Sequence, residues 1–134
     1  MQLKLSDPSL LKNQAYIDGQ WVDADNGATF DVTNPANGEL ITAVARAGTA
    51  ETNRAVAAAS AAMAQWARKP AKARAGILRK WFDLMMQNQE DLAILMTAEQ
   101  GKVLAESRGE IAYGAAFVEW FGEQAKRIDG DVIP

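Results

Sequence analysis

The sequence contains no cysteine and no histidine among its 134 residues. Without cysteine there is no thiolate nucleophile, no disulfide and no thiolate ligand for a metal. Without histidine there is no imidazole base to activate a serine, and no side chain that titrates near neutral pH in its unperturbed form. We therefore expect no catalytic residue in this chain, whose remaining reactive groups are carboxylates, lysines, tyrosines, serines and threonines.

Basic charge and long apolar runs are also scarce. Lys and Arg number 14 against 17 Asp and Glu, so the chain lacks the basic surface that nucleic-acid binding needs. The alanine-rich stretch at 55–67 is interrupted by Ser60 and Gln65 and is too short to cross a bilayer. The first seven residues hold no apolar run of signal-peptide length. We expect a cytoplasmic protein without nucleic-acid or membrane partners.

The apolar pattern divides the chain into two parts. Residues 14–45 alternate with a period of two around Asn-Gly and Asn-Pro turns at 26–27 and 34–35, which predicts a small antiparallel β-meander. From residue 49 the period changes to about 3.6 residues, which predicts a helical part over 49–128. The fold class is therefore α/β, in the form of an α+β unit with short antiparallel strands followed by three long helices.

Capping and breaking residues place these three helices. Thr49 is the predicted N-cap of the first helix, which ends before Pro70 because a residue that precedes proline avoids the α conformation. The second helix is expected over 71–100 with a kink near Asn88, and the third over 103–127. In the first helix the pattern assigns one buried stripe, made of Val56, Ala59, Met63 and Trp66.

The second and third helices are apolar on more than one side. Trp81 and Phe82 widen the apolar surface of the second helix, and Tyr113, Phe117 and Trp120 widen that of the third. The third helix also contains glycines at 109, 114 and 122, which indicates close approach by other backbone because each costs about 1 kcal/mol relative to alanine. A helix that is apolar on several sides is buried on several sides. We expect the chain to be part of a larger protein or to associate through a large interface.

Glu99 stands out among the charged residues. It lies at the end of an apolar helix, just before the expected C′ residue Gly101, where the negative pole of the helix disfavours a carboxylate. It is either a surface residue at a helix end, a cation ligand or a partner in a buried salt bridge. The aromatic residues Tyr113, Phe117 and Trp120 are likewise either core or pocket residues.

Five segments carry a resemblance to a known family. They are FDVTNPANGE at 30–39, ILRKWF at 77–82, MTAEQGK at 96–102, GEIAY at 109–113 and EWF at 119–121. In this order and spacing they resemble the N-terminal segment of NAD(P)-dependent aldehyde dehydrogenases, and the resemblance covers essentially the whole chain. Within the family the chain is similar to bacterial succinate-semialdehyde dehydrogenases, with the glutarate-semialdehyde enzymes as near relatives.

The resemblance implies that residues 1–134 form the N-terminal part of the aldehyde dehydrogenase fold. The rest of the coenzyme domain, the catalytic domain and the oligomerisation domain would follow, with the nucleophilic cysteine, the general-base glutamate and the coenzyme glycines. The parent enzyme would oxidise succinate semialdehyde to succinate with NAD or NADP, with glutarate semialdehyde as an alternative substrate. We expect the fragment alone to be inactive and to bind neither coenzyme.

The resemblance also implies binding residues and partners. In the family a monovalent cation is held by backbone carbonyls before the Asn-Pro turn and by a carboxylate before Gly-Lys, which corresponds to Val32, Thr33 and Glu99. The family's access tunnel for the aldehyde corresponds to Tyr113 and Phe117. The expected partners are the remainder of the parent chain, like subunits of a homo-oligomer, and a small aldehyde.

Two departures from the family pattern affect local rigidity and packing. Val103 follows Gly-Lys where proline is usual, and Asp129 stands where tyrosine often precedes Gly-Asp.

An alternative interpretation of the chain is a stand-alone helical interaction module, or a remnant without enzymatic activity. The two interpretations differ in whether the reading frame continues after Pro134.

Overall fold

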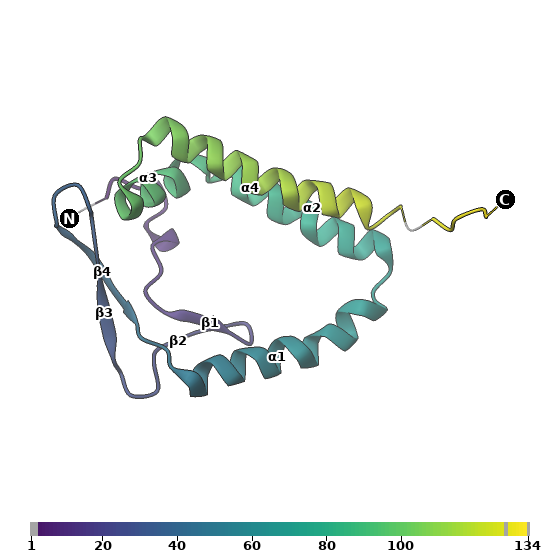
Figure 1. The fold of residues 1–134 in the computed structure, drawn as a ribbon, viewed down its shortest axis with the longest axis horizontal. Coiled ribbons are helices and arrows are strands. Elements are labelled where there is room, and N and C mark those ends of the chain that lie inside the picture. Colours follow the sequence, from purple (N-terminus) through teal and green to yellow (C-terminus); the bar gives the residue numbers. More distant parts are fainter. Residues whose placement is uncertain (1–2, 128, 134) are drawn as a thin grey trace.

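The computed structural model describes residues 3–127 and 129–133. Its elements are, in chain order, a 3-10 helix at Pro8–Leu10, then β1 (Ala15–Ile17), β2 (Gln20–Val22), β3 (Thr29–Thr33), β4 (Leu40–Ala45), α1 (Thr49–Arg68), α2 (Ala71–Gln87), α3 (Gln89–Gln100) and α4 (Leu104–Gln124). The α2–α4 pair lies opposite α1, α3 lies at one end of this pair, β3 and β4 connect the two sides at that end of the molecule, and the β1–β2 hairpin lies beside α1 (Figure 1). No helix among these residues is long and apolar enough to cross a membrane.

The strands form two hairpins. β1 pairs with β2, and β3 pairs with β4, each as a separate two-stranded antiparallel sheet. This differs from the single β-meander predicted over residues 14–45. After β2 the chain turns toward α1, because the Asp25 N–H donates to the Glu51 carboxylate at 2.8 Å. The hairpins meet at one point, where the Ala45 N–H donates to the Asn13 carbonyl at 2.8 Å.

The first residue of α1 differs by one position from the prediction. The N-cap is Gly48, and Thr49 is already helical. Glu51, at the third helical position, accepts the Gly48 N–H at 2.9 Å through its carboxylate. The capping hydrogen bond therefore comes from a side chain within the helix. At the other end α1 stops at Arg68, before Pro70, as predicted.

The stripe predicted to bury one face of α1 is only partly covered. Val56 and Met63 are 63% and 64% exposed, whereas Trp66 is half-buried and Ala59 lies beside the β1–β2 hairpin. On its inner side α1 contacts the β1–β2 hairpin, where Ala55 and Ala58 lie against the turn at Asp18. The helix is therefore held mainly near its beginning.

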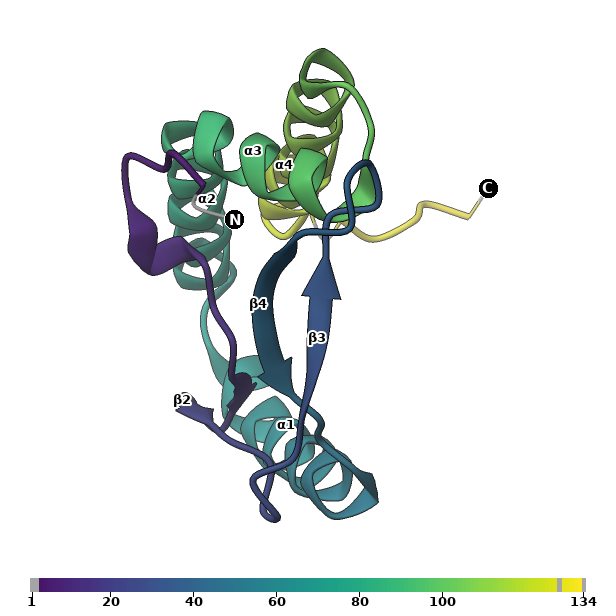
Figure 2. The ribbon, with the colours of Figure 1, turned by 90° about the vertical axis from the view of Figure 1, so that its left-hand side faces the viewer.

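The expected kink near Asn88 is a complete break. The Asn88 N–H and Nδ2 both donate to the Leu84 carbonyl, which ends α2, and the Asn88 carbonyl accepts the Leu92 N–H at 3.0 Å, which begins α3. Figure 2 shows α3 running across the direction of α2. The described part thus has four helices where three were predicted. The last helix ends at Gln124, short of the predicted 127, and residue 128, the predicted end of the helical part, lies outside the described residues.

Small side chains dominate the buried core. The buried apolar residues are mostly alanine and are Ala24, Ile41, Ala75, Ala93, Leu95, Ala98, Ile111 and Ala115. The predicted close approach is confirmed at Gly122, where an added Cβ would lie 3.2 Å from the Leu78 Cβ. At Gly114 the nearest atom is an ordinary contact at 3.9 Å, and Gly109 faces open space. The large aromatic side chains contribute little to this core.

Candidate functional site

The turn between β3 and β4 packs against the end of α3. Gly101 follows α3 in the left-handed conformation, with φ of +75°, and a Cβ built on it would lie 2.9 Å from the Cγ of Pro35. Figure 2 shows the tip of this hairpin reaching the α3–α4 connection. The two sequence motifs, Asn34-Pro35 and Glu99-to-Lys102, therefore form one corner of the molecule.

The Asn34 side chain and backbone make the turn at this corner rigid. Its Oδ1 accepts the Ala36 N–H at 2.9 Å, and its carbonyl accepts the Gly38 N–H at 2.7 Å. Its own N–H donates to the Glu39 carbonyl at 2.9 Å. Such an Asx turn fixes the backbone from residue 34 to residue 36.

The corner gathers the segments that contain Val32, Thr33 and Glu99. Val32 is half-buried and Thr33 is exposed, and the β3–β4 register shifts between them, where the ladder departs from regular pairing. Glu99 is exposed in the last turn of α3. Within residues 3–127 and 129–133 no three His, Cys, Asp or Glu side chains cluster to hold a metal. A cation at this corner would depend on backbone carbonyls and one carboxylate, a donor set of low total charge.

The first turns of α4 are bonded to α3 by directional contacts. The Ser107 hydroxyl lies 2.8 Å from that of Thr97 and is completely buried. The Arg108 guanidinium donates to both Glu90 carboxylate oxygens at 2.7 Å, and this contact lowers the pKa of Glu90. Lys102 forms a further ion pair with Glu110.

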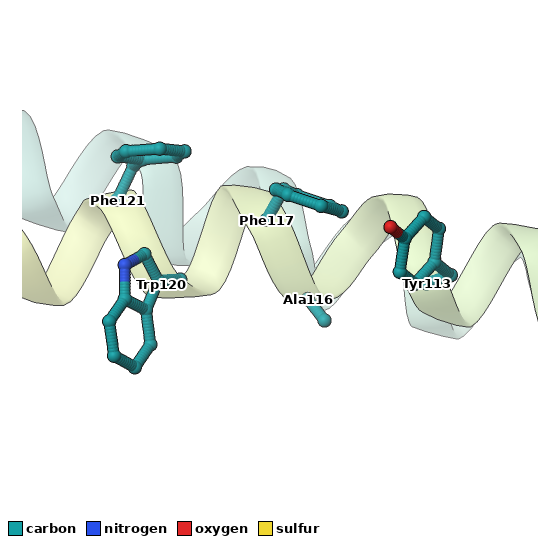
Figure 3. Close-up of a pocket in the computed structure, with 5 residues that line it drawn as sticks. All are labelled: Tyr113, Ala116, Phe117, Trp120 and Phe121. Carbon is teal, nitrogen blue, oxygen red and sulfur yellow. The ribbon is translucent and has the colours of Figure 1, made fainter.

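An aromatic hollow of about 370 Å³ lies on an outward face of α4 (Figure 3). It is lined by Tyr113, Ala116, Phe117, Trp120 and Phe121. The Tyr113 and Phe117 rings meet edge to face, with centroids 4.9 Å apart and planes at 89°. Tyr113 is 68% exposed. We call this group the aromatic hollow.

The two residues predicted to line a tunnel are thus adjacent in one hollow. The sequence interpretation did not include Ala116 or Phe121 in this group, and Phe121 is 59% exposed. Residues 113, 116, 117, 120 and 121 follow the helical spacing of three and four residues, which identifies them as one face. This spacing is the feature of the sequence from which all five lining residues could have been predicted.

A second apolar face lies on α2. Ile77, Trp81 and Leu84 are each about half exposed, at 48%, 55% and 45%. The helix pair therefore presents apolar surface from both of its helices. Exposed apolar patches of this kind are typical of surfaces that other protein covers.

Comparison with known proteins places these features in a family. The profile of the aldehyde dehydrogenase family matches residues 21–134. The chain is 61% identical to the glutarate-semialdehyde dehydrogenase of Pseudomonas aeruginosa and 58% identical to the 3-sulfolactaldehyde dehydrogenase of Pseudomonas putida. It is 55% identical to the NADP-dependent succinate-semialdehyde dehydrogenase of Escherichia coli. Each match covers 98% of this chain and 27% of the relative.

Solved structures give the same result for the fold. The aldehyde dehydrogenase of Brucella melitensis superposes with a TM-score of 0.95 at 54% identity, over 99% of this chain and 28% of that one. The enzyme PnpE, in complex with nicotinamide adenine dinucleotide, superposes with a TM-score of 0.85 at 41% identity, over 92% of this chain and 26% of that one.

The fold and the matches together show the family of the chain. The chain belongs to the aldehyde dehydrogenase family and corresponds to the N-terminal part of that fold. It spans about a quarter of the length of the curated relatives that it matches.

Proposed function

We propose that this chain is a segment of an enzyme that oxidises succinate semialdehyde to succinate with NAD or NADP, with glutarate semialdehyde as the alternative substrate. The observation that carries the proposal is the 55–61% identity to semialdehyde dehydrogenases over 98% of the chain. In such a reaction the aldehyde and water give the carboxylate, and the coenzyme, when bound, accepts a hydride. The segment itself supplies scaffold and binding surface.

The aromatic hollow is the part of the segment that would meet the substrate. The relatives are named for succinate semialdehyde, glutarate semialdehyde and 3-sulfolactaldehyde, which all join an aldehyde to an acidic group. No lysine or arginine lines the hollow, so it suits the uncharged part of such a molecule. In our proposal Tyr113 and Phe117 form one wall of the aldehyde tunnel, and the acidic end is bound elsewhere in the enzyme.

The described residues do not fit a dinucleotide. A phosphate-binding loop needs closely spaced glycines before a helix, and the sequence has no Gly-x-Gly-x-x-Gly motif. The coenzyme would therefore be held by the remainder of the parent chain. The choice between NAD and NADP belongs to that part as well, and both are represented among the similar proteins.

In our proposal a monovalent cation binds at the corner between β3 and α3, where the carbonyls of Val32 and Thr33 and the Glu99 carboxylate would hold it. The packing of Gly101 on Pro35 supports this cation site, because it fixes the two segments against each other.

The exposed apolar faces of α2 and α4 would pack against the remainder of the parent chain or like subunits in a cytoplasmic homo-oligomer.

The test is an assay of the full-length protein that contains this segment. We expect reduction of NAD or NADP with succinate or glutarate semialdehyde, and a much lower kcat/KM with butanal, which matches succinate semialdehyde in length but lacks the acid. A preference for butanal, or no turnover with either semialdehyde, would refute the proposal. A monodisperse, cooperatively unfolding 134-residue protein from a reading frame of that length would favour a stand-alone interaction module.

A further inference from the structure

We infer that Arg108 and Ser107 are positioning residues, which hold α4 on α3 and thereby set the place of Tyr113 and Phe117 in the aromatic hollow. The inference rests on the proposed function of the hollow and adds residues that do not line it. Neither Ser107 nor Arg108 touches the hollow, whose lining begins at Tyr113.

The contact between α4 and α2 is extensive, close and apolar. It includes Ala75 on α2 and Ala115 and Gly122 on α4, and Leu78 packs directly against Gly122. The half-exposed ion pair of Arg79 with Glu119 adds a polar contact. This packing holds the two helices together, and α3 adds the buried hydrogen bond and the two-pronged ion pair described next.

The contact between α4 and α3 is directional. Ser107 is 0% exposed, and its hydroxyl has Thr97 as hydrogen-bonding partner at 2.8 Å. A buried hydroxyl that loses its partner is costly, so this bond permits one orientation of the helix. The hydrogen bond between Ser107 and Thr97 therefore fixes which face of α4 packs against α3.

Arg108 is bound to the beginning of α3 through both its side chain and its backbone. The guanidinium makes a two-pronged pair with Glu90 at 2.7 Å, a geometry that is specific in angle as well as distance. The Arg108 carbonyl also accepts the Gln89 Nε2 at 2.9 Å. Two neighbouring residues of α4 are thus attached to α3.

Tyr113 follows Arg108 after five residues, or about 7.5 Å along the helix axis. A helix transmits rotation over this distance as a rigid body, so the attachment at 107 and 108 determines where the rings at 113 and 117 point. Loss of the attachment should misplace the wall of the hollow without removing any group from it.

The chain offers a matched control. Arg54 makes the same two-pronged contact with Asp25, also at 2.7 Å for both bonds, and the exposure of the two pairs is similar. Arg54 lies on α1, which is remote from the hollow (Figure 1). The two arginines therefore make similar ion pairs and differ in their location relative to the aromatic hollow.

The experiment compares Arg108→Ala with Arg54→Ala in the full-length protein. For Arg108→Ala we expect KM for the semialdehyde to rise about five- to tenfold with kcat within about twofold, because ground-state positioning is lost and the reacting groups are unchanged. The amides of residues 104–121 should also exchange hydrogen faster. Arg54→Ala should leave KM and the hydrogen exchange of residues 104–121 unchanged. The double variant with the charges exchanged, Glu90→Arg with Arg108→Glu, should restore KM. If the Arg108→Ala protein does not accumulate in soluble form, Glu90→Gln replaces it, because this change keeps the side-chain size and should also raise KM.

Equal behaviour of the Arg108 and Arg54 variants would overturn the inference. So would faster exchange at α4 together with unchanged KM. If the wild-type protein oxidises no semialdehyde, the proposed function fails, and unaltered exchange at residues 104–121 in the Arg108 variant would refute the attachment independently.

Discussion

Gly101 and Pro35 are packed so closely that no side chain fits between them. A Cβ on Gly101 would lie 2.9 Å from the Pro35 Cγ, and Gly101 has a φ of +75°. This contact joins the end of α3 to the β3–β4 turn across 66 residues of sequence. The corner that contains Val32, Thr33 and Glu99 depends on it.

Gly101→Ala is predicted to destabilise the protein for two reasons. The left-handed conformation costs an alanine about 1–2 kcal/mol, and the contact with Pro35 adds an overpacking cost of about 1–3 kcal/mol. Gly38 is the control, because it also has positive φ, of +73°, but has open space where a Cβ would lie. Denaturant unfolding should show a larger loss for Gly101→Ala than for Gly38→Ala. Equal losses would mean that the contact with Pro35 contributes nothing.

Two glycines in α4 should respond to alanine with opposite signs. Gly122→Ala brings a Cβ to 3.2 Å from the Leu78 Cβ, and the predicted loss in unfolding free energy is about 1–3 kcal/mol. Gly109→Ala meets open space and should gain about 0.5–1 kcal/mol from helix propensity. Thermal unfolding of the two variants measures both. A gain at Gly122 would contradict the packing of α4 on α2.

Glu51 should make stability depend on acid pH. The Asp25 N–H, followed by further backbone N–H groups including that of Gly48, lowers the pKa of this carboxyl below its ordinary value of 4.5. Because the folded pKa is the lower one, the stabilisation is complete above the unfolded pKa. It is lost as pH falls through the folded pKa.

Glu51→Gln tests this contribution directly. The variant should unfold at a lower temperature than the wild type at pH 7, by a few degrees, and the difference should shrink as the pH falls below the ordinary carboxyl pKa of 4.5. Melting curves of both proteins at several pH values provide the measurement. A difference that stays constant down to pH 3 would show that the charge of Glu51 has no role.

Tyr113→Ala and Phe117→Ala should weaken aldehyde binding in the full-length enzyme. Each removes an apolar wall of the hollow, so we predict KM increases of about tenfold with a smaller change in kcat. Tyr16→Ala is the control, because Tyr16 is a comparably exposed aromatic residue whose ring contacts that of Trp21 in the β1–β2 hairpin. Steady-state kinetics on the three variants decide, and a similar KM for all three would exclude the hollow from the tunnel.

The cation proposal predicts an ion-specific stabilisation. Potassium chloride should raise the melting temperature of the full-length protein more than N-methylglucamine chloride at the same ionic strength. Glu99→Gln should abolish this difference, whereas Glu106→Gln, a change of the same kind in the first turn of α4, should preserve it. A wild-type protein that melts identically in both salts would refute the site.

The elements that local chemistry determines could be predicted. Pro70 ends α1 and Gly101 ends α3, because each acts on its immediate neighbours. The β3–β4 hairpin follows from its Asn34-Pro35 turn. The aromatic spacing likewise placed Tyr113 and Phe117 on one helix, where the structure has them.

The errors arise where distant residues decide. Nothing in the local pattern states that the Glu51 carboxylate accepts the Asp25 N–H, which separates the two hairpins. Asn88 is neither proline nor glycine, so the apolar period runs through it, although its hydrogen bonds to Leu84 break the helix. Burial of Val56 and Met63 on α1 was predicted from a pattern that identifies an apolar face but does not show whether another element covers it.

The most direct test is the coenzyme reduction catalysed by the purified 134-residue chain itself. Succinate semialdehyde with NAD or NADP is incubated with the chain, with a blank lacking it, and with the full-length protein as positive control. The account predicts turnover by the full-length protein and none above the blank by the chain, since it contains no cysteine nucleophile. Aldehyde-dependent NADH or NADPH formation by the chain alone would contradict it.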